Sequence, residues 1–265
     1  MDFLNIFNDY GAITIISLII LSFIAGFIDA VVGGGGLIQL PALLISLPKT
    51  PVPTIFGTNK IAALAGTSIS AVKYSARIKF NYKLLLAISI CAGIASFLGA
   101  KTVSFINVNT LKPLILAVLI GMAIFTFLKK DLGSVQSKNL SFDKQLIYGS
   151  LVGLIVGFYD GFFGPGTGSF FVLGFVVILG FEFVQASAYS KVINCMTNIS
   201  ALLVFIRQGN YLLELAIIMS VCNITGSLVG TRLALKKGNT FVRTFFLLIV
   251  TLMIFRYSYD IFIKK

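Results

Sequence analysis

Histidine is absent from this chain of 265 residues, and cysteine occurs only three times. Without histidine the sequence lacks the commonest metal ligand and the commonest general base, so a serine–histidine dyad is excluded. Cys91, Cys195 and Cys222 each lie inside an apolar run with no close pair among them, which predicts neither a metal site nor a disulfide framework. We therefore expect no metal and no cofactor.

Charged residues are also scarce. They make up 11% of the chain against 57% hydrophobic residues, and the mean hydropathy is +0.99, whereas a soluble domain carries about 25% charged residues. Apolar runs occupy 13–28, 84–105, 111–128 and 241–263, and a helix needs about 20 residues to cross a bilayer. The predicted fold class is therefore all-α, a polytopic helical membrane protein with about eight transmembrane helices (eight to ten). The runs are too long and too uniform for a β-barrel.

Acidic residues are few, with 9 Asp and Glu against 21 Lys and Arg and a formal net charge of +12. Such a charge can indicate nucleic acid as a partner. Here the basic residues cluster in short loops between apolar runs, which is the pattern of cytoplasmic loops in membrane proteins. We expect a lipid bilayer and no nucleic acid as partner, with the clusters at 73–83 and 129–144 on the cytoplasmic side.

The sequence matches itself at an offset of 131 residues. GFIDA at 26–30 aligns with GFYDG at 157–161, and Lys60 aligns with Lys191. We predict a first membrane repeat at 1–131, a polar linker at 132–144 and a second membrane repeat at 145–265. If the short apolar segments at 37–47 and 169–181 do not cross the membrane, there are eight spans and the repeats are parallel. If they do cross, there are ten spans and the repeats are inverted.

Each predicted repeat has the same order of elements. A span that ends near an aspartate is followed by a glycine-rich break, a short apolar segment of about 12 residues, a span with a lysine, and two ordinary spans. Twelve helical residues reach only about 18 Å, so we expect each short segment to be a half-helix or a re-entrant segment. The predicted spans are 13–31, 55–73, 84–105 and 111–128 in the first repeat, and 146–160, 184–206, 212–234 and 241–263 in the second.

The glycine-rich breaks are the first candidate for a substrate-binding site. They comprise Gly33, Gly34, Gly35 and Gly36 in one half, and Gly164, Pro165, Gly166, Thr167 and Gly168 in the other. Consecutive glycines and a proline interrupt a helix, and matching breaks in two halves indicate the binding site of a transporter. A helix that restarts after a break presents free N–H groups and the positive end of its dipole, which favours an anion.

Lysines inside the spans are the second candidate. Lys60 follows Thr58 and Asn59, and Lys191 follows Ser190 and precedes Asn194 and Asn198. A lysine within a bilayer is costly and is usually functional, so we assign these seven residues to substrate binding. The alternative is that the lysines extend to the membrane surface.

Asp29 and Asp160 end their spans just before the breaks, and we assign them to coupling or gating. They could take up a proton, form ion pairs with Lys60 and Lys191, or cap the returning half-helix. From the sequence, Asp29 could contact either lysine.

The aspartate, the glycine run and LIxLP of the first half, the GTNK segment, and GFYDGFFGPGTGSF of the second half resemble the sulfite exporter TauE/SafE family, also called the 4-toluene sulfonate uptake permease family. The resemblance covers nearly the whole chain. It implies a multi-pass transporter of the bacterial inner membrane that carries sulfite, sulfonates or related small organic anions. The residues that match the family's first motif are Asp29, Gly33–Gly36, Asn59 and Lys60. Those that match its second motif are Asp160, Gly164–Gly168 and Lys191.

The function predicted is a secondary transporter of a small anion, with alternating access between the two repeats and no enzymatic activity. A cation or proton-coupled carrier that uses the aspartates is the alternative. An intramembrane aspartyl protease is a remote alternative, because such an enzyme needs two adjacent carboxylates and the chain lacks the Gly-x-Gly-Asp motif of that family. The sequence leaves homo-oligomerisation, the substrate, the direction of transport and the coupling ion open.

Overall fold

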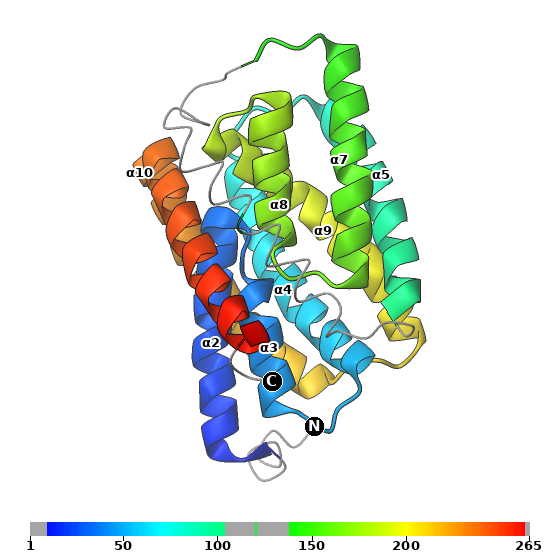
Figure 1. Cartoon of the computed structure of the whole chain (residues 1–265), viewed down its shortest axis with the longest axis vertical. Helices are drawn as coiled ribbons and strands as arrows, with labels where there is room; N and C mark the ends of the chain where they lie inside the picture. Colours follow the sequence, from blue (N-terminus) through cyan, green and yellow to red (C-terminus); the bar gives the residue numbers. More distant parts are fainter. Residues whose placement is uncertain (1–9, 104–119, 121–137, 263–265) are drawn as a thin grey trace.

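The structure, a computed structural model, describes residues 10–103, 120 and 138–262 (Figure 1). The described residues form helices and contain no strand. In chain order the helices are α2 (Ala12–Val32), α3 (Gly36–Ser46), α4 (Val52–Ser75), α5 (Tyr82–Thr102), α7 (Phe142–Phe162), α8 (Thr167–Gly174), the π-helix η2 (Phe175–Leu179), α9 (Phe183–Arg207) and α10 (Leu213–Phe262).

The protein is a polytopic helical membrane protein. Among the described residues, α2, α5, α7, α9 and the Leu213–Leu248 part of α10 are long and apolar enough to span a membrane. The predicted spans at 212–234 and 241–263 correspond to the two helices that make up α10, which are separated at Gly238 by a non-helical backbone with φ 71° and ψ −161°. The predicted span at 111–128 lies outside the described residues. Large apolar side chains on the outer faces are exposed, for example Ile13 and Ile155, as a lipid-facing surface requires.

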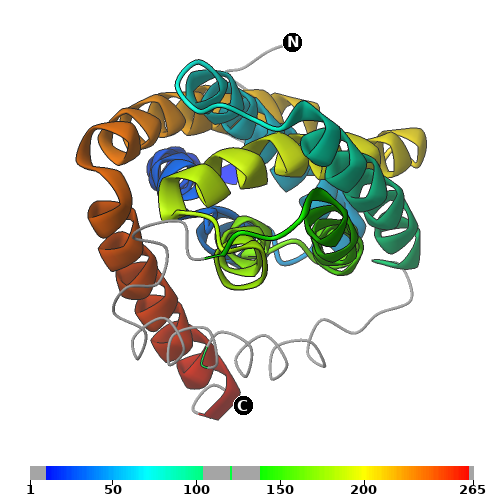
Figure 2. The same cartoon turned by 90° about the horizontal axis from the view of Figure 1, so that it is seen from above.

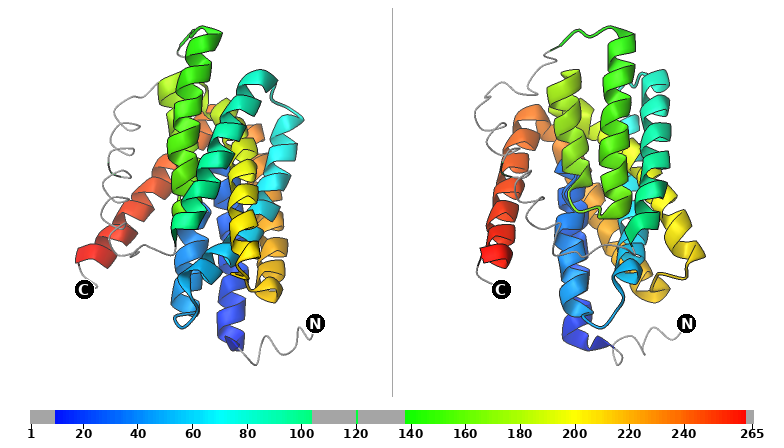
Figure 3. Two further views of the ribbon diagram at one scale, coloured as in Figure 1. Left: turned by 90° about the vertical axis from the view of Figure 1, so that its right-hand side faces the viewer. Right: turned by 45° about the vertical axis from the view of Figure 1, so that its right-hand side comes forward.

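Two short helices follow the breaks, close to the positions predicted. α3 has 11 residues, and α8 continues into η2 to span Thr167–Leu179. Figures 1 and 3 show that α2 and α3 run in opposite directions in the lower part of the molecule, while α7 and α8 do so in the upper part. The two hairpins therefore enter from opposite ends, and their tips meet near the middle.

α9 lies at the centre of the bundle, where it contacts α4, α5, α7, α8 and α10 (Figure 2). It is also the most buried of the membrane-spanning helices. Its central position places Lys191, Asn194 and Asn198 beside the tips of both hairpins.

Close helix packing follows the offset of 131 residues. α5 packs on α7, and α10 packs on α2. Gly99 of α5 lies against the carbonyl of Phe158 on α7, and Gly230 of α10 lies against the carbonyl of Phe27 on α2. The two contacts are equivalent, because adding 131 to Gly99 gives Gly230 and subtracting 131 from Phe158 gives Phe27. Small residues allow such close backbone approach between helices in a membrane.

The glycines of α7 differ in how much added volume they tolerate. A Cβ at Gly161 would collide with the backbone of Ser96, whereas a Cβ at Gly149 would meet the tip of the Ile88 side chain, which can rotate away. Gly161→Ala is expected to lower the free energy of unfolding by about 1–3 kcal/mol, and Gly149→Ala by much less. SDS-induced unfolding in mixed micelles, followed by circular dichroism, compares the two. Equal losses would contradict this packing.

Candidate functional site

Both breaks begin with a glycine in the left-handed region. Gly33, with φ 82°, ends α2 and donates its N–H to the carbonyl of Asp29 at 2.8 Å. Gly164, with φ 90°, follows α7 and donates to the carbonyl of Tyr159 at 3.1 Å. These two glycines are 131 residues apart and share a positive φ, but their acceptors differ, because Asp29 lies four residues before Gly33 and Tyr159 lies five residues before Gly164.

The two breaks touch each other. The N–H of Ser169 donates to the carbonyl of Gly33 at 3.0 Å. Gly33 and Gly168 are so close that a Cβ on either would collide with the backbone of the other. Only glycine allows two backbones to approach this closely, which explains why the breaks are rich in this residue.

Several backbone N–H groups at the breaks have no partner. α3 begins at Gly36 and α8 begins at Thr167, so the first N–H groups of both helices lack intrahelical acceptors. Within the described part of the chain no protein acceptor bonds the N–H groups of Gly34, Gly35, Gly36, Gly166 and Gly168. The positive ends of two helices therefore meet in the interior of the protein.

A polar cavity of about 30 Å³ lies at this meeting point. That volume accommodates one or two water molecules. Besides glycines of both breaks, the residues that line it are Asp29, Gln39, Asn59, Lys60, Ala63, Thr67, Asp160, Thr167, Asn194, Asn198 and Asn223. Seven helices (α2, α3, α4, α7, α8, α9 and α10) and both breaks thus contribute to one small cavity.

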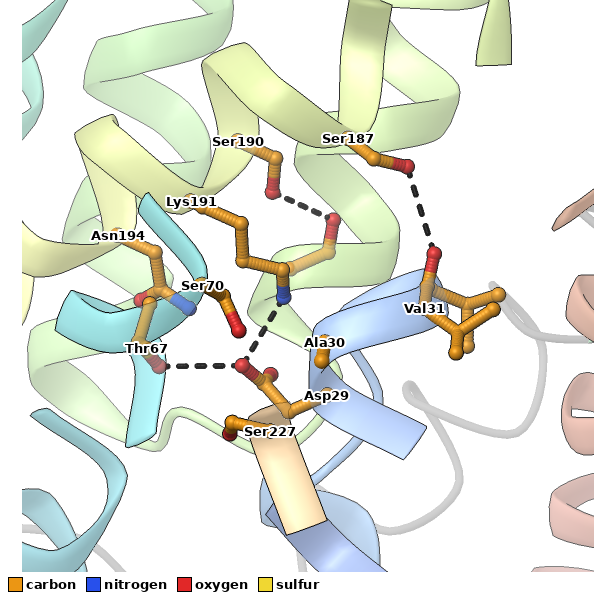
Figure 4. Close-up of polar contacts among 12 residues, drawn as sticks. Asp29, Ala30, Val31, Thr67, Ser70, Ser187, Ser190, Lys191, Asn194 and Ser227 are labelled. Carbon is orange, nitrogen blue, oxygen red and sulfur yellow. Dashed lines mark hydrogen bonds and ion pairs between the residues drawn. The ribbon is translucent and has the colours of Figure 1, made fainter. Parts of the chain in front are cut away.

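Each lysine forms an ion pair with the aspartate of the other half. Lys60 Nζ lies 2.7 Å from Asp160 Oδ2, and Lys191 Nζ lies 2.9 Å from Asp29 Oδ2. The two ion pairs are equivalent, because Lys60 aligns with Lys191 and Asp160 aligns with Asp29 at the offset of 131. Lys191 has an exposed fraction of 0% and Lys60 of 5%, so neither side chain reaches the membrane surface. Figure 4 shows Lys191 and Thr67 converging on the same carboxylate oxygen of Asp29.

The ion pairs make the site electrically neutral. Two ammonium groups face two carboxylates, and a buried ion pair is stable only when its charges are matched and hydrogen-bonded. The lysines therefore do not form an open cationic site in this conformation. In the described residues, the groups free to bind a ligand are the glycine N–H groups, Asn194 Nδ2 and Asn59, whose buried Oδ1 has no hydrogen-bond partner.

A chain of hydrogen bonds orients Asn194. Lys60 donates to Asn198 Oδ1 at 3.1 Å, and Asn198 Nδ2 donates to Asn194 Oδ1 at 3.2 Å. Because each amide oxygen accepts from a donor of known identity, the assignment of oxygen and nitrogen in both side chains follows from the network. The Nδ2 of Asn194 is left without a hydrogen-bond acceptor in the described residues, on a side chain only 6% exposed that lines the cavity.

The described residues contain no group of three His, Cys, Asp or Glu side chains that could hold a metal ion. The two aspartates pair with lysines instead of with each other, an arrangement unlike the proton-sharing dyad of an aspartyl protease.

Comparison with known proteins agrees with the resemblance noted in the sequence. Residues 18–257 match the profile of the family described as sulfite exporter TauE/SafE. The chain belongs to the TauE/SafE family. No solved structure gives a significant match to it.

Relatives of this TauE/SafE protein carry transporter names. It is 36% identical over 227 residues to a "Probable membrane transporter protein ORF9" of a Sinorhizobium species, covering 85% of both chains. It is 32% identical to a "Probable membrane transporter protein" of Haemophilus influenzae, over 95% of this chain and 97% of the relative. It is 34% identical to the "Probable membrane transporter protein YfcA" of Escherichia coli K12, over 92% and 89%. The chain is a multi-pass membrane transporter protein and not an enzyme.

Most of the predicted site residues of the TauE/SafE protein lie together at the cavity, and five do not line it. Lys191 lies behind Asp29, and Ser190 donates to the carbonyl of Gly168 at 3.0 Å. Thr58 donates to Thr54 and accepts from the N–H of Leu212, so it joins α4 to the start of α10. The other two are Gly34 and Pro165, whose carbonyl accepts a bond from Tyr159 at 2.6 Å.

Four cavity residues were not among those predicted, namely Gln39, Ala63, Thr67 and Asn223. Gln39 and Asn223 are 1% and 2% exposed, and Asn223 Nδ2 donates to Gln39 Oε1 at 3.0 Å. Their counterparts at the offset of 131 are Phe170 and Ala92, so comparing the halves conceals them. The available signal was simpler, because each is an amide side chain inside an apolar helix.

Proposed function

We propose that this protein is a secondary transporter of a small anion, such as sulfite, another sulfur oxyanion or a small sulfonate, and that the anion binds in the cavity between the two breaks. One observation carries the proposal: unpartnered N–H groups from both breaks converge with Asn194 Nδ2 and Lys60 on a single small polar cavity.

The chemistry of these groups favours an anion. Oxyanions accept several hydrogen bonds at once, and helix N-termini supply donors and a favourable dipole without adding a mobile charge. The absence of Cβ atoms at Gly35 and Gly36 lets the ligand approach the backbone. A cation is disfavoured, because both carboxylates at the cavity are already neutralised by lysines.

The cavity is too small to hold the anion in this conformation. At about 30 Å³ it is smaller than a sulfur oxyanion with three oxygen atoms requires, so the tips of the two hairpins must separate for the anion to bind. We propose that the halves are inverted repeats that rock against each other around the site. Hairpins that enter from opposite ends support this mechanism (Figures 1 and 3). The sequence contains no P-loop pattern, so gradients of ions or substrate would supply the energy.

Asn194→Ala is expected to weaken anion binding about 10- to 100-fold, because a hydrogen bond to a charged group contributes about 1.5–3 kcal/mol. Purified protein is titrated with sulfite, sulfate, thiosulfate and methanesulfonate, and affinity is measured by thermal shift. Uptake of the labelled anion into proteoliposomes is then compared with uptake of labelled sodium.

Ser187→Ala is the matched control. Ser187 lies on the same helix two turns away, makes only a 3.4 Å bond to the carbonyl of Val31, and does not line the cavity. It should bind the anion as the wild type does. Wild-type affinity in Asn194→Ala would remove the cavity from the anion pathway, and binding of none of the four anions would contradict the proposed function itself.

A further inference from the structure

Charge balance at the cavity constrains what can bind there. Lys60 and Lys191 are matched by Asp160 and Asp29, so the buried site is neutral before any ligand enters. An added anion would leave a net negative charge in an interior of low dielectric, which is costly. A compensating positive charge must therefore enter with the anion.

Lys60 is the one lysine of the described residues that lines the cavity, and it is held by Asp160. When an anion enters, the ammonium group of Lys60 can turn toward it and away from the carboxylate. Asp160 would then keep a buried charge without its partner, and an unpaired buried charge is costly unless another positive charge neutralises it.

We propose that each anion is bound together with one proton, which is taken up by Asp160, and that Lys60 moves from this carboxylate to the anion. This inference rests on the proposed function, because it names the coupling ion of the same site. The proton comes from water on the side to which the cavity opens and adds to a carboxylate oxygen of Asp160. Lys60 keeps all its protons. On the opposite side the anion and the proton leave together, and the ion pair forms again.

The hydrogen bonds distinguish Asp160 from Asp29. Asp29 Oδ2 accepts two bonds, from Lys191 at 2.9 Å and from Thr67 at 3.0 Å. Lys191 does not line the cavity and cannot follow the anion. Asp160 accepts from Lys60 alone among the described side chains. Asp29 is therefore the structural carboxylate, and Asp160 is the one that exchanges its partner.

No other ionisable group opposes this exchange in the described surroundings of Asp160. α5 presents Gly99 and Ser96 to α7, and α8 presents Thr167, which donates to the carbonyl of Gly164. The neighbouring Tyr159 hydroxyl is bonded to the carbonyl of Pro165. Across the cavity, the remaining charges are Asp29 and Lys191, which neutralise each other.

Calorimetry of the wild-type protein tests the inference directly. Thiosulfate and methanesulfonate are titrated in buffers of different ionisation enthalpy near neutral pH, where both probes are fully ionised. Proton uptake appears as a linear dependence of the binding enthalpy on the buffer, with an expected slope of about one proton per anion. Binding with zero slope overturns the inference. Absence of binding counts against the proposed function instead.

Two matched variants locate the proton. Asp160→Asn should bind either anion without proton uptake. Without an anion it should be less stable than the wild type, and the anion should raise its melting temperature by more, because the anion then pairs with Lys60. Asp29→Asn combined with Lys191→Met removes both charges of the other ion pair and leaves the site neutral, so this double variant should keep the proton uptake. Proton uptake that persists in Asp160→Asn, or disappears in the double variant, overturns the assignment to Asp160. If Asp160→Asn is isolated only in the presence of thiosulfate, the wild-type slope still decides.

Proteoliposomes give an independent electrical test. Methanesulfonate with one proton carries no net charge, so its uptake should be insensitive to a membrane potential and should make the interior more acidic. Thiosulfate with one proton carries one negative charge, so its uptake should rise when a potassium diffusion potential makes the interior positive. Methanesulfonate uptake driven by such a potential without acidification would overturn the inference.

Discussion

Replacing Lys191 with methionine is expected to lower the free energy of unfolding by about 3–5 kcal/mol, because Asp29 then remains buried without its counter-charge. The pair is enclosed, with side-chain exposures of 0% for Lys191 and 11% for Asp29, and its atoms are 2.9 Å apart. SDS-induced unfolding in mixed micelles, followed by circular dichroism, measures the loss.

The second substitution tests which carboxylate is the partner. Lys191→Met combined with Asp29→Asn removes both charges and should recover most of the stability, since a neutral pair of similar size often replaces a buried ion pair at little cost. Lys191→Met combined with Asp160→Asn leaves Asp29 and Lys60 both unpaired and should be less stable than Lys191→Met alone. Recovery by Asp160→Asn would show that the lysines pair within their own halves.

Sequence reasoning located the elements of the site but not their pairing. The breaks at Gly33–Gly36 and Gly164–Gly168, the two lysines and the two aspartates are visible as departures from an apolar pattern. Pairing depends on how the two halves are placed against each other. The offset of 131 is compatible with pairs inside each half and with pairs across the halves, and the structure has the latter.

The comparison of the halves also overstated their likeness. It emphasises residues that recur, such as Lys60 and Lys191, although only Lys60 lines the cavity. It conceals polar residues that align with apolar residues of the other half, such as Gln39, which aligns with Phe170. The residues that line the cavity differ between the two halves, so the residues that differ carry information that the offset cannot supply.

Spans could be predicted from length and hydropathy, but their directions could not. The distribution of Lys and Arg was compatible with parallel and with inverted repeats. The short helix α3 reverses the chain after α2, and α8 does so after α7 (Figure 1), so the short segments count as changes of direction. Hydropathy does not show this, because a half-helix of 11 residues and a loop of the same composition have the same average.

Gly33→Ala is expected to be the most damaging single substitution at the breaks. The new Cβ would collide with the backbone of Gly168, and alanine is strained at a φ of 82°. Left-handed strain costs about 1–3 kcal/mol, and overpacking against fixed backbone adds a similar amount. We expect most of the protein to be lost from the monodisperse peak in detergent size-exclusion chromatography, and the remainder to melt at a clearly lower temperature.

Gly36→Ala is the matched control. Gly36 begins α3 in the ordinary helical region, and a Cβ there would lie 3.4 Å from Pro165 Cα, which is a tolerable contact. This variant should fold like the wild type while its methyl group reduces the space in the cavity, so anion affinity should fall without a fall in melting temperature. A stable Gly33→Ala protein would show that the two breaks do not touch as the structure describes. Because the two glycines are three residues apart in the same break, the difference between the variants separates the contact that holds the hairpins together from the surface that receives the ligand.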